Sequence, residues 1–470
     1  MQIGGFSASG RVADSMKTRK TSLFILALLF YVVFIPDYAP FPAELKALVV
    51  LVIVQILWIG RVFPLALSAL NLILILSLHF FSYEKTLSYF ASPIVWLMFS
   101  TFFLSGAFIS TGLAARVSLF VLGWSRGSSR LLILISFVLT AILSVVLPSN
   151  VGKASLAASV YNSILKSMDP IADMRNTSKS MFIGLTYIVP ISGALVATGA
   201  SSTIYAFGLI EKQGASFDYL SWLWAFSLPV LLFLFLLWIL AMVLFPPEKV
   251  DRRKLMEIID RKAAEKGRLT SREWKMMIII SLTLVLWVAQ PLHGVSIPLV
   301  GLLGAVLTLL PAIGVWDWEE ARTRIDWDMM LFFAATIMVS QMLIETGTLQ
   351  LVSDLLVNLL GGQSKLLIFI LMVLLTMLLR LIFVNILGLL TIMLPLAITV
   401  GQSLPGDTAM GVAMAVFLAS IPGFLFIIQS PVHLISFSYQ YFSERDLLKI
   451  GLPSMLIWTL LILFSALVWW

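Results

Sequence analysis

The chain contains no cysteine and few ionisable side chains. Without cysteine, disulfides, thiol catalysis and cysteine-based metal sites are excluded. The three histidines, His79, His293 and His433, lie far apart in the sequence. No HExxH, P-loop or GxGxxG pattern occurs, and no His/Asp/Glu grouping forms a catalytic cluster, although His433 with Ser430 comes nearest. We therefore expect neither an enzyme nor a resident metal or cofactor.

Charge is scarce, and apolar residues dominate the composition. Only 12% of the 470 residues are charged and 60% are hydrophobic, whereas about 25% are charged in soluble domains. The mean hydropathy is +1.02. This composition predicts a polytopic helical protein embedded in a lipid bilayer. The net charge of +7 comes from basic residues that we interpret as setting the orientation of the chain in the membrane. We therefore expect no nucleic-acid partner.

Apolar runs of about 20 residues can cross a bilayer, and broken or paired shorter runs suggest re-entrant segments. The sequence predicts an all-α fold with about 11 transmembrane helices and two re-entrant hairpins. In the first half the predicted segments are helices near 21–35, 47–60, 64–81 and 93–113, a hairpin near 131–165, a broken segment at 180–210 and a helix at 219–246. In the second half they are helices near 276–291, 296–313 and 327–345, a hairpin near 366–400, a broken segment at 409–442 and a helix at 450–470.

The distribution of basic residues predicts the orientation. The linker at 247–275 is expected to form an amphipathic surface helix with Leu255, Ile258 and Ile259 on one face. If the N-terminus is cytoplasmic, eleven Lys and Arg residues and ten more in the linker lie inside, against three in the outer loops of the first half. We expect a multi-pass protein of a bacterial-type inner (plasma) membrane, with the C-terminus outside.

The same order of segments occurs on both sides of the linker. Each half has helices, a hairpin with an asparagine at its break, a segment broken by small polar residues and a closing helix. The extra leading helix in residues 1–46 gives the two repeats, 47–246 and 276–470, opposite orientations. Inverted repeats with broken segments are typical of transporters that bind substrate near the membrane midplane.

The first hairpin breaks at Pro148-Ser149-Asn150-Val151-Gly152-Lys153. Such a break frees backbone groups that hydrocarbon cannot satisfy, so it must lie within protein or beside a water-filled cavity. The second hairpin breaks at Val384-Asn385. Each returning helix has free N–H groups and a positive dipole end, which suit an anion. The alternative is that each asparagine only caps a kink.

Lys153 and Arg380 are basic residues that belong neither to the inner nor to the outer loops beside the predicted membrane segments. Either could pair with an anionic substrate, and Lys153 could also replace a cotransported cation; the alternative is snorkelling to an interface. Membrane-embedded acids are scarce, which argues against a cation or proton antiporter. The two broken segments add candidate polar groups, namely Thr198, Gly199, Ser201, Ser202 and Thr203 in the first and Gln429, Ser430, Pro431 and His433 in the second. The alternative for both is ordinary helix kinking.

These motifs resemble those of the divalent anion/sodium symporter family over nearly the whole chain. The family's paired Ser-Asn-Thr hairpin motifs correspond to Ser149-Asn150-Val151 and Val384-Asn385-Ile386. The Pro148–Ala154 pattern is similar to that of the dicarboxylate-exchanger branch, where the basic residue is usually arginine. Further matching pieces are Ser92-Pro93 through Leu113, Leu292-His293-Gly294 and Tyr439 to Leu452.

The resemblance implies a homodimeric elevator carrier that binds a small anionic substrate between the hairpin tips and the two broken helices. It assigns binding roles to Ser149, Asn150 and Asn385, and matches Thr198-Gly199 and Pro431 to positions in the unwound loops. The candidate substrate-binding residues are Ser149, Asn150, Val151, Gly152, Lys153, Thr198, Gly199, Ser201, Ser202, Thr203, Asn385, Ser430, Pro431 and His433. The candidate cation-binding residues are Ser149, Asn150 and Asn385.

The departures from the family pattern bear on what drives transport. Val151 and Ile386 replace both motif threonines, and Val384 replaces a serine. Thr203 and His433 stand where the family has loop asparagines. The lost hydroxyls weaken the case for sodium, and Lys153 strengthens the case for exchange. We therefore predict a secondary transporter of C4/C5 dicarboxylates that works by exchange; the alternative is sodium-coupled symport of dicarboxylate, citrate or sulfate.

Overall fold

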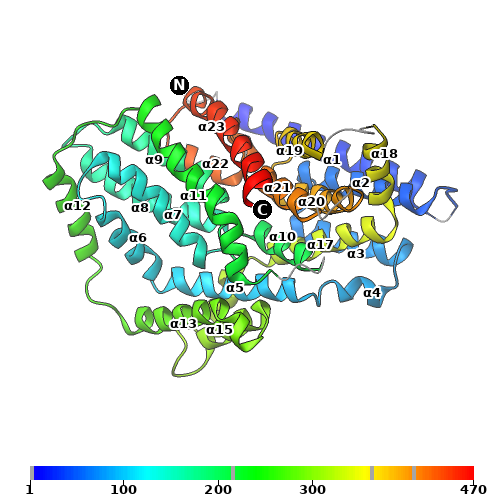
Figure 1. Ribbon diagram of the computed structural model, residues 1–470, viewed down its shortest axis with the longest axis horizontal. Coiled ribbons are helices and arrows are strands. Elements are labelled where there is room, and N and C mark those ends of the chain that lie inside the picture. Colours follow the sequence, from blue (N-terminus) through cyan, green and yellow to red (C-terminus); the bar gives the residue numbers. More distant parts are fainter. Residues whose placement is uncertain (1–4, 37, 213–216, 360–364, 405–408) are drawn as a thin grey trace.

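A computed structural model describes residues 5–36, 38–212, 217–359, 365–404 and 409–470, and within these ranges the regular structure is entirely helical (Figure 1). Five helices are long and apolar enough to cross a membrane. They are α5 (Pro93–Ser110), α7 (Ser129–Val146), α11 (Tyr219–Leu244), α17 (Trp327–Glu345) and α23 (Glu444–Phe464), the last continued by the short η2 (Ser465–Trp469). Several other apolar helices are shorter than 18 residues. The predicted all-helical fold is therefore confirmed for the described residues.

The first half begins with helices on either side of a short surface helix. They are α1 (Gly5–Phe34), α2 (Ala43–Ile59), α3 (Leu65–His79), α4 (Tyr83–Ser88), α5 and α6 (Leu113–Gly123). The helix predicted near 21–35 starts earlier, at Gly5, because polar residues such as lysine and serine also fit a helix. The helix predicted at 93–113 ends at Ser110, because Gly112 adopts a left-handed φ of 83°.

The first hairpin and the first broken helix follow. The hairpin consists of α7 and α8 (Asn150–Met168), and the broken helix of α9 (Arg175–Ser192) and α10 (Ser201–Glu211). The break was expected at 197–203, but helix α9 already ends at Ser192. Pro190 and Gly193 explain the earlier end, since proline removes a helical donor and glycine is a weak helix former. Ser201, Ser202 and Thr203 therefore lie in the first turn of α10.

The second half repeats this order after the linker helix α12 (Arg252–Ala264). Its leading helices are α13 (Ser271–Val288), α14 (Gln290–His293), α15 (Ile297–Leu309), α16 (Trp318–Arg324), α17 and α18 (Thr348–Leu359). The hairpin consists of α19 (Lys365–Arg380) and α20 (Ile386–Gln402). The broken helix consists of α21 (Ala409–Ser420), the 3₁₀ turn η1 (Ile427–Gln429) and α22 (Pro431–Ser438). Helix α21 ends before Pro422-Gly423 rather than at 429–433, again because proline and glycine follow.

The packing of the two halves follows the same repeat. Helix α5 of the first half packs on α15 of the second. In the same way α17, the counterpart of α5, packs on α3, the counterpart of α15. Each hairpin contacts the other half: α8 packs on α22, and α20 packs on α10. The bends before α6 and α18 both use a left-handed glycine, Gly112 and Gly347. The two breaks are thus brought to the interface between the halves.

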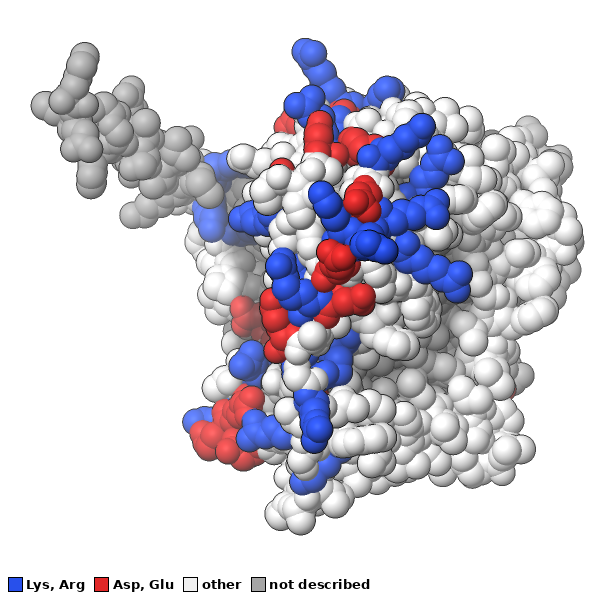
Figure 2. All heavy atoms as spheres, turned by 90° about the vertical axis from the view of Figure 1, so that its left-hand side faces the viewer, with Lys and Arg blue, Asp and Glu red and all other residues white. Residues whose placement is uncertain are grey.

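Charged side chains collect at one end of the molecule. Figure 1 shows α12, α6 and α8 at one end of the long axis, and α4 and α18 at the other. Figure 2, which looks onto the α12 end, shows Lys and Arg in a band across that end with uncharged surface beside it. As predicted, Leu255, Ile258 and Ile259 are the buried residues of α12.

Candidate functional site

The tip of the first hairpin is a short extended turn between two helices. Leu147 ends α7 in an extended conformation, and the Ser149 hydroxyl caps α8 by accepting a hydrogen bond from the Gly152 N–H over 3.1 Å. The Asn150 Oδ1 atom is buried and has no hydrogen-bond partner among the described residues. The Val151 side chain is 46% exposed. Asn150 therefore keeps a free acceptor at the start of a helix.

Lys153 is completely buried one turn into α8. Its Nζ donates to the Ser144 hydroxyl on α7 and to the Gly199 carbonyl oxygen in the first break, both over 2.9 Å. Ser144 in turn contacts the Ser192 hydroxyl on α9 at 2.8 Å. Lys153 makes no ion pair within the described residues. It does not snorkel to an interface; it joins the first hairpin to the first break.

The first break, residues 193–200, is held in shape by its own hydrogen bonds. The Thr203 hydroxyl donates back to the Gly193 carbonyl oxygen over 2.7 Å. A side chain at Gly199 would lie 2.6 Å from the same oxygen and 3.1 Å from the Ser144 carbonyl oxygen, so this close approach requires glycine. Thr198 is buried in the break, and Ser202 is buried in the first turn of α10.

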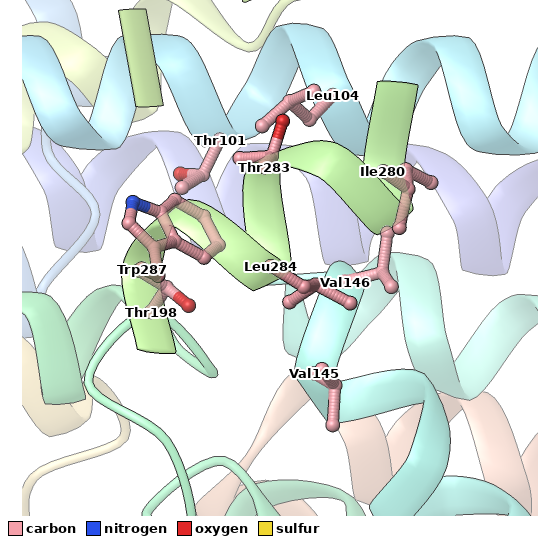
Figure 3. A pocket seen from close by; sticks show the side chains of 9 residues that line it. All are labelled: Thr101, Leu104, Val145, Val146, Thr198, Ile280, Thr283, Leu284 and Trp287. Carbon is pink, nitrogen blue, oxygen red and sulfur yellow. The ribbon is translucent and has the colours of Figure 1, made fainter. Parts of the chain in front are cut away.

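Thr198 also faces the boundary between the hairpin and helices α5 and α13. Figure 3 shows it beside Trp287 and Leu284 of α13, with Thr101 of α5 and Val146 of α7 nearby. The cavity among these residues has a volume of about 10 Å³, the lower limit for one water molecule. This side of the break is thus closely packed.

The second hairpin is tied to the second break by Arg380. This arginine is 2% exposed, and its Nη1 donates to the carbonyl oxygens of Phe383, at the hairpin tip, and of Gln429, the latter over 3.0 Å. Its Nε and Nη2 atoms have no partner among the described residues. Asn385 caps α20 by accepting from the Leu387 N–H over 2.9 Å. The sequence suggested that Arg380 could pair with an anionic substrate but did not place it among the site residues; its partners are carbonyl groups that no side-chain motif reveals.

The remaining candidates of the second break shape its backbone. The His433 Nε2 atom contacts the Gly423 carbonyl oxygen at 2.8 Å, and Ser430 caps α22 through the Val432 N–H. Pro431 is exposed at the start of α22. The His433 ring also lies 6.0 Å from that of Tyr187 on α9, so the second break contacts the first half.

The candidate residues thus form two clusters, one around each break. The first joins Lys153 and Ser144 to Gly199, and the second joins Arg380 to Gln429. The buried Lys, Arg, His, Asp and Glu side chains in the described ranges are Lys153, Arg380, His433 and Glu273. Only Glu273 is acidic, and it pairs with Arg116 over 2.8 Å. Two buried basic side chains without a carboxylate partner are suited to an anion.

No group of three or more His, Cys, Asp or Glu side chains able to hold a metal occurs in the described ranges. The site's other polar groups are hydroxyls, amides and backbone carbonyls. Backbone carbonyls of unwound helices and the N-termini of half-helices are the groups that bind ions and anionic substrates in many transporters. The arrangement can therefore bind a small ion, but it offers no nucleophile–base pair for catalysis.

Similar proteins are membrane transporters. The L-tartrate/succinate antiporter of Shigella sonnei is 26% identical over 406 residues, 83% of this chain and 80% of that protein. The putative malate transporter YflS of Bacillus subtilis is 28% identical, covering 66% of this chain and 64% of that protein. Dicarboxylate transporter 2.1, chloroplastic, of Arabidopsis thaliana is 26% identical over 60% of this chain. The matched region spans about half of that protein, 51% of its length.

A solved structure has a related fold. The YdaH transporter of Alcanivorax borkumensis matches with a TM-score of 0.53 at 13% identity, covering 86% of this chain and 96% of that one. The family model described as the sodium:sulfate symporter transmembrane region matches residues 17–470. Since that match covers nearly the whole chain, the protein belongs to this family of divalent anion/sodium symporters and is a membrane transporter.

Proposed function

We propose that the protein exchanges small divalent organic anions of the C4/C5 dicarboxylate class, held between the hairpin tips and the two breaks. The observation that carries this proposal is the pair of buried basic side chains, Lys153 and Arg380, with no acidic partner in the described structure. A buried charge is costly unless it is compensated, and a dianion would compensate both. The N-termini of α8 and α20 add positive dipole ends beside the two tips.

The names of the relatives support this substrate class. Malate, tartrate and succinate are C4 dicarboxylates, and the relatives named for these substrates or for dicarboxylates are similar over 60% to 83% of this chain. The free Nε and Nη2 donors of Arg380 suit a carboxylate, which accepts paired hydrogen bonds from a guanidinium group. Asn150 and Asn385 supply amide groups at the two tips.

The position of Lys153 favours exchange over sodium coupling. Its Nζ lies between a hydroxyl and a backbone carbonyl oxygen of the first break. Oxygens of this kind bind Na⁺ in transporters with unwound helices. An ammonium group already held there supplies a positive charge that a cation would otherwise bring.

Sodium-coupled symport is the second candidate. The unpartnered Asn150 Oδ1 atom favours it, because this oxygen could coordinate a cation. Purified protein in proteoliposomes separates the two functions. We expect uptake of labelled succinate that requires internal dicarboxylate and is equal in sodium and choline buffers. Uptake into empty vesicles that requires a sodium gradient would establish symport instead.

We further propose an elevator mechanism in a homodimer, on the family resemblance, with the N-terminus cytoplasmic and the C-terminus outside. The orientation is supported by the basic band on the α12 end. The chain has no cysteine, so single-cysteine labelling is unambiguous. In whole cells an impermeant maleimide should label Lys85→Cys, while Glu257→Cys should react only after the membrane is opened. The reverse pattern would invert the orientation.

A further inference from the structure

An apolar groove lies between the first hairpin and the neighbouring helices. It is formed by α5, α6, α7 and α13, has a volume of about 220 Å³, and is lined by residues that include Phe108, Val117, Leu143, Met277 and Ile280. Apart from Ser281, every side chain that lines it is apolar. Apolar cavities of this kind exclude water and accept hydrocarbon.

The exposed side of α13 shows where the groove lies relative to the membrane. Trp274, Ile278, Leu282 and Val285 are 43–62% exposed and follow one helical stripe, which is the pattern of a face in contact with lipid. Trp274 ends this stripe, and tryptophan prefers the headgroup layer. The groove residues Met277 to Ser281 lie about 5–10 Å further along the helix, which is acyl-chain depth.

A basic rim lies at the headgroup level of the same groove. Arg116, next to the groove residue Val117, donates to the Gly267 carbonyl oxygen over 2.9 Å and pairs with Glu273. These contacts fix the loop that carries Arg268 close to the groove. Arg268 and Arg272 are both exposed and form no ion pair in the described residues.

The surroundings of this rim are strongly basic and carry exposed aromatic anchors. Residues 252–272 contain eight Lys or Arg and three Asp or Glu, part of the band seen in Figure 2. Phe120 on α6 and Trp124 directly after it, 67% and 48% exposed, lie one and two turns after Arg116. Basic residues beside interfacial aromatics are characteristic of surfaces that bind anionic lipids.

We propose that this groove holds an acyl chain of one anionic phospholipid whose headgroup binds Arg268 and Arg272. The site is built from both an apolar groove and a positive rim, so it distinguishes anionic from zwitterionic lipids. One wall of the groove is helix α7 of the first hairpin, which would move in the elevator mechanism proposed above. The groove residues Val146 and Ile280 also line the narrow cavity at Thr198, so the lipid chain would lie directly between the hairpin and α13 (Figure 3).

Lipid retention measured by native mass spectrometry tests this proposal without relying on transport. The full-length protein is purified, mixed with phosphatidylglycerol or phosphatidylcholine, and the bound lipid is counted. We expect one phosphatidylglycerol to be retained and phosphatidylcholine to be lost. Removing both charges with Arg268→Gln/Arg272→Gln should weaken retention by about thirtyfold, since two basic residues near a headgroup together contribute on the order of 2 kcal/mol.

Two matched controls separate this site from general lipid binding. Arg322→Gln/Arg324→Gln removes two exposed arginines from an acidic segment, and should leave retention unchanged. Ser281→Trp should fill the groove and abolish retention, whereas Leu282→Trp, on the adjacent lipid-facing position, should not. If Ser281→Trp fails to fold, the double arginine variant decides alone. Equal retention of both lipids, or unchanged retention in the double arginine variant, would overturn the proposal.

Discussion

The Lys153 Nζ atom donates a hydrogen bond to the Gly199 carbonyl oxygen over 2.9 Å, so a buried side chain of the first hairpin is bonded directly to the first break. Ser144 completes this contact from the other helix of the hairpin. Any movement of the hairpin relative to the break must disturb these bonds. Lys153 therefore both holds the hairpin against the break and supplies a positive charge to the site.

Replacing Lys153 by alanine should abolish sodium-independent exchange. The change removes the positive charge and leaves the Gly199 carbonyl oxygen without its donor, which also costs about 1–3 kcal/mol of stability. Exchange is measured in succinate-loaded proteoliposomes. Lys166→Ala, an exposed position on the same helix, serves as the control and should exchange normally. Unchanged exchange in Lys153→Ala protein that remains folded would rule out the role proposed for this side chain.

The two tip asparagines should respond differently to alanine substitution. Asn150 has a buried, unpartnered oxygen, so Asn150→Ala should weaken substrate binding while the melting temperature stays nearly constant. Asn385 caps α20, so Asn385→Ala should weaken binding and also lower stability by about 1 kcal/mol. Ligand-induced thermal shift with succinate measures both quantities. Asn71→Ala, on α3, is the control. Normal binding in both variants would mean that the asparagines are only structural.

Arg380→Met should reduce anion binding more than Arg380→Lys. Methionine keeps much of the buried volume but removes the charge and the donors to the Phe383 and Gln429 carbonyl oxygens. Lysine restores a charge without the planar group that binds a carboxylate at two points. Equilibrium binding of labelled succinate gives the comparison, with the exposed Arg445→Gln as a control. Equal affinity in all three proteins would show that the guanidinium group does not face the substrate.

The Arg116–Glu273 pair should make stability depend on acid pH. Burial raises the pKa of Glu273, but hydrogen bonds from Arg116 and Thr270 outweigh burial and lower the pKa below its ordinary value of 4.5. Because the folded pKa lies below the unfolded one, the pair stabilises fully above about pH 4.5, and the stabilisation is lost as the pH falls through the lowered pKa.

Glu273→Gln should therefore lower the free energy of unfolding by about 1–3 kcal/mol at pH 7. On acidification the variant should lose less of its stability than the wild type. Melting temperatures between pH 7 and pH 3.5 provide the measurement. Glu257→Gln, on the exposed side of α12, should follow the wild-type curve. Parallel curves for Glu273→Gln and wild type would exclude the pair as the source of acid sensitivity.

Much of the helix order could be predicted from the sequence, because apolar runs and proline or glycine breaks are local signals. The two predicted hairpins correspond to the helix pairs α7–α8 and α19–α20. Helix α18 was missed because its 12 residues include Gln350 and Asp354, so a search for long apolar runs passes over it. The breaks were placed a few residues late, because their polar residues were taken as the break itself, whereas several begin the next helix.

The site was predicted less completely for a different reason. Lys153 and the tip asparagines are unusual residues at membrane depth, and the sequence alone marks them. The partners of Lys153 and Arg380 are the carbonyl oxygens of Gly199 and Gln429. Every residue carries a carbonyl group, so only the folded chain reveals which ones converge. The same applies to the groove beside α13, whose walls come from four separate helices.

The two buried basic side chains also have an electrical consequence. If both are charged and travel with the hairpins, the empty carrier moves two uncompensated positive charges, whereas a bound dianion makes the moving unit neutral. Each charge carried through the whole potential changes the energy by about 2.3 kcal/mol per 100 mV, in addition to the cost of leaving it unpaired in a medium of low dielectric constant. The empty protein would then return slowly and the loaded one readily. Obligatory exchange would follow from electrostatics alone, and exchange of one dianion for another would generate no current across a planar bilayer.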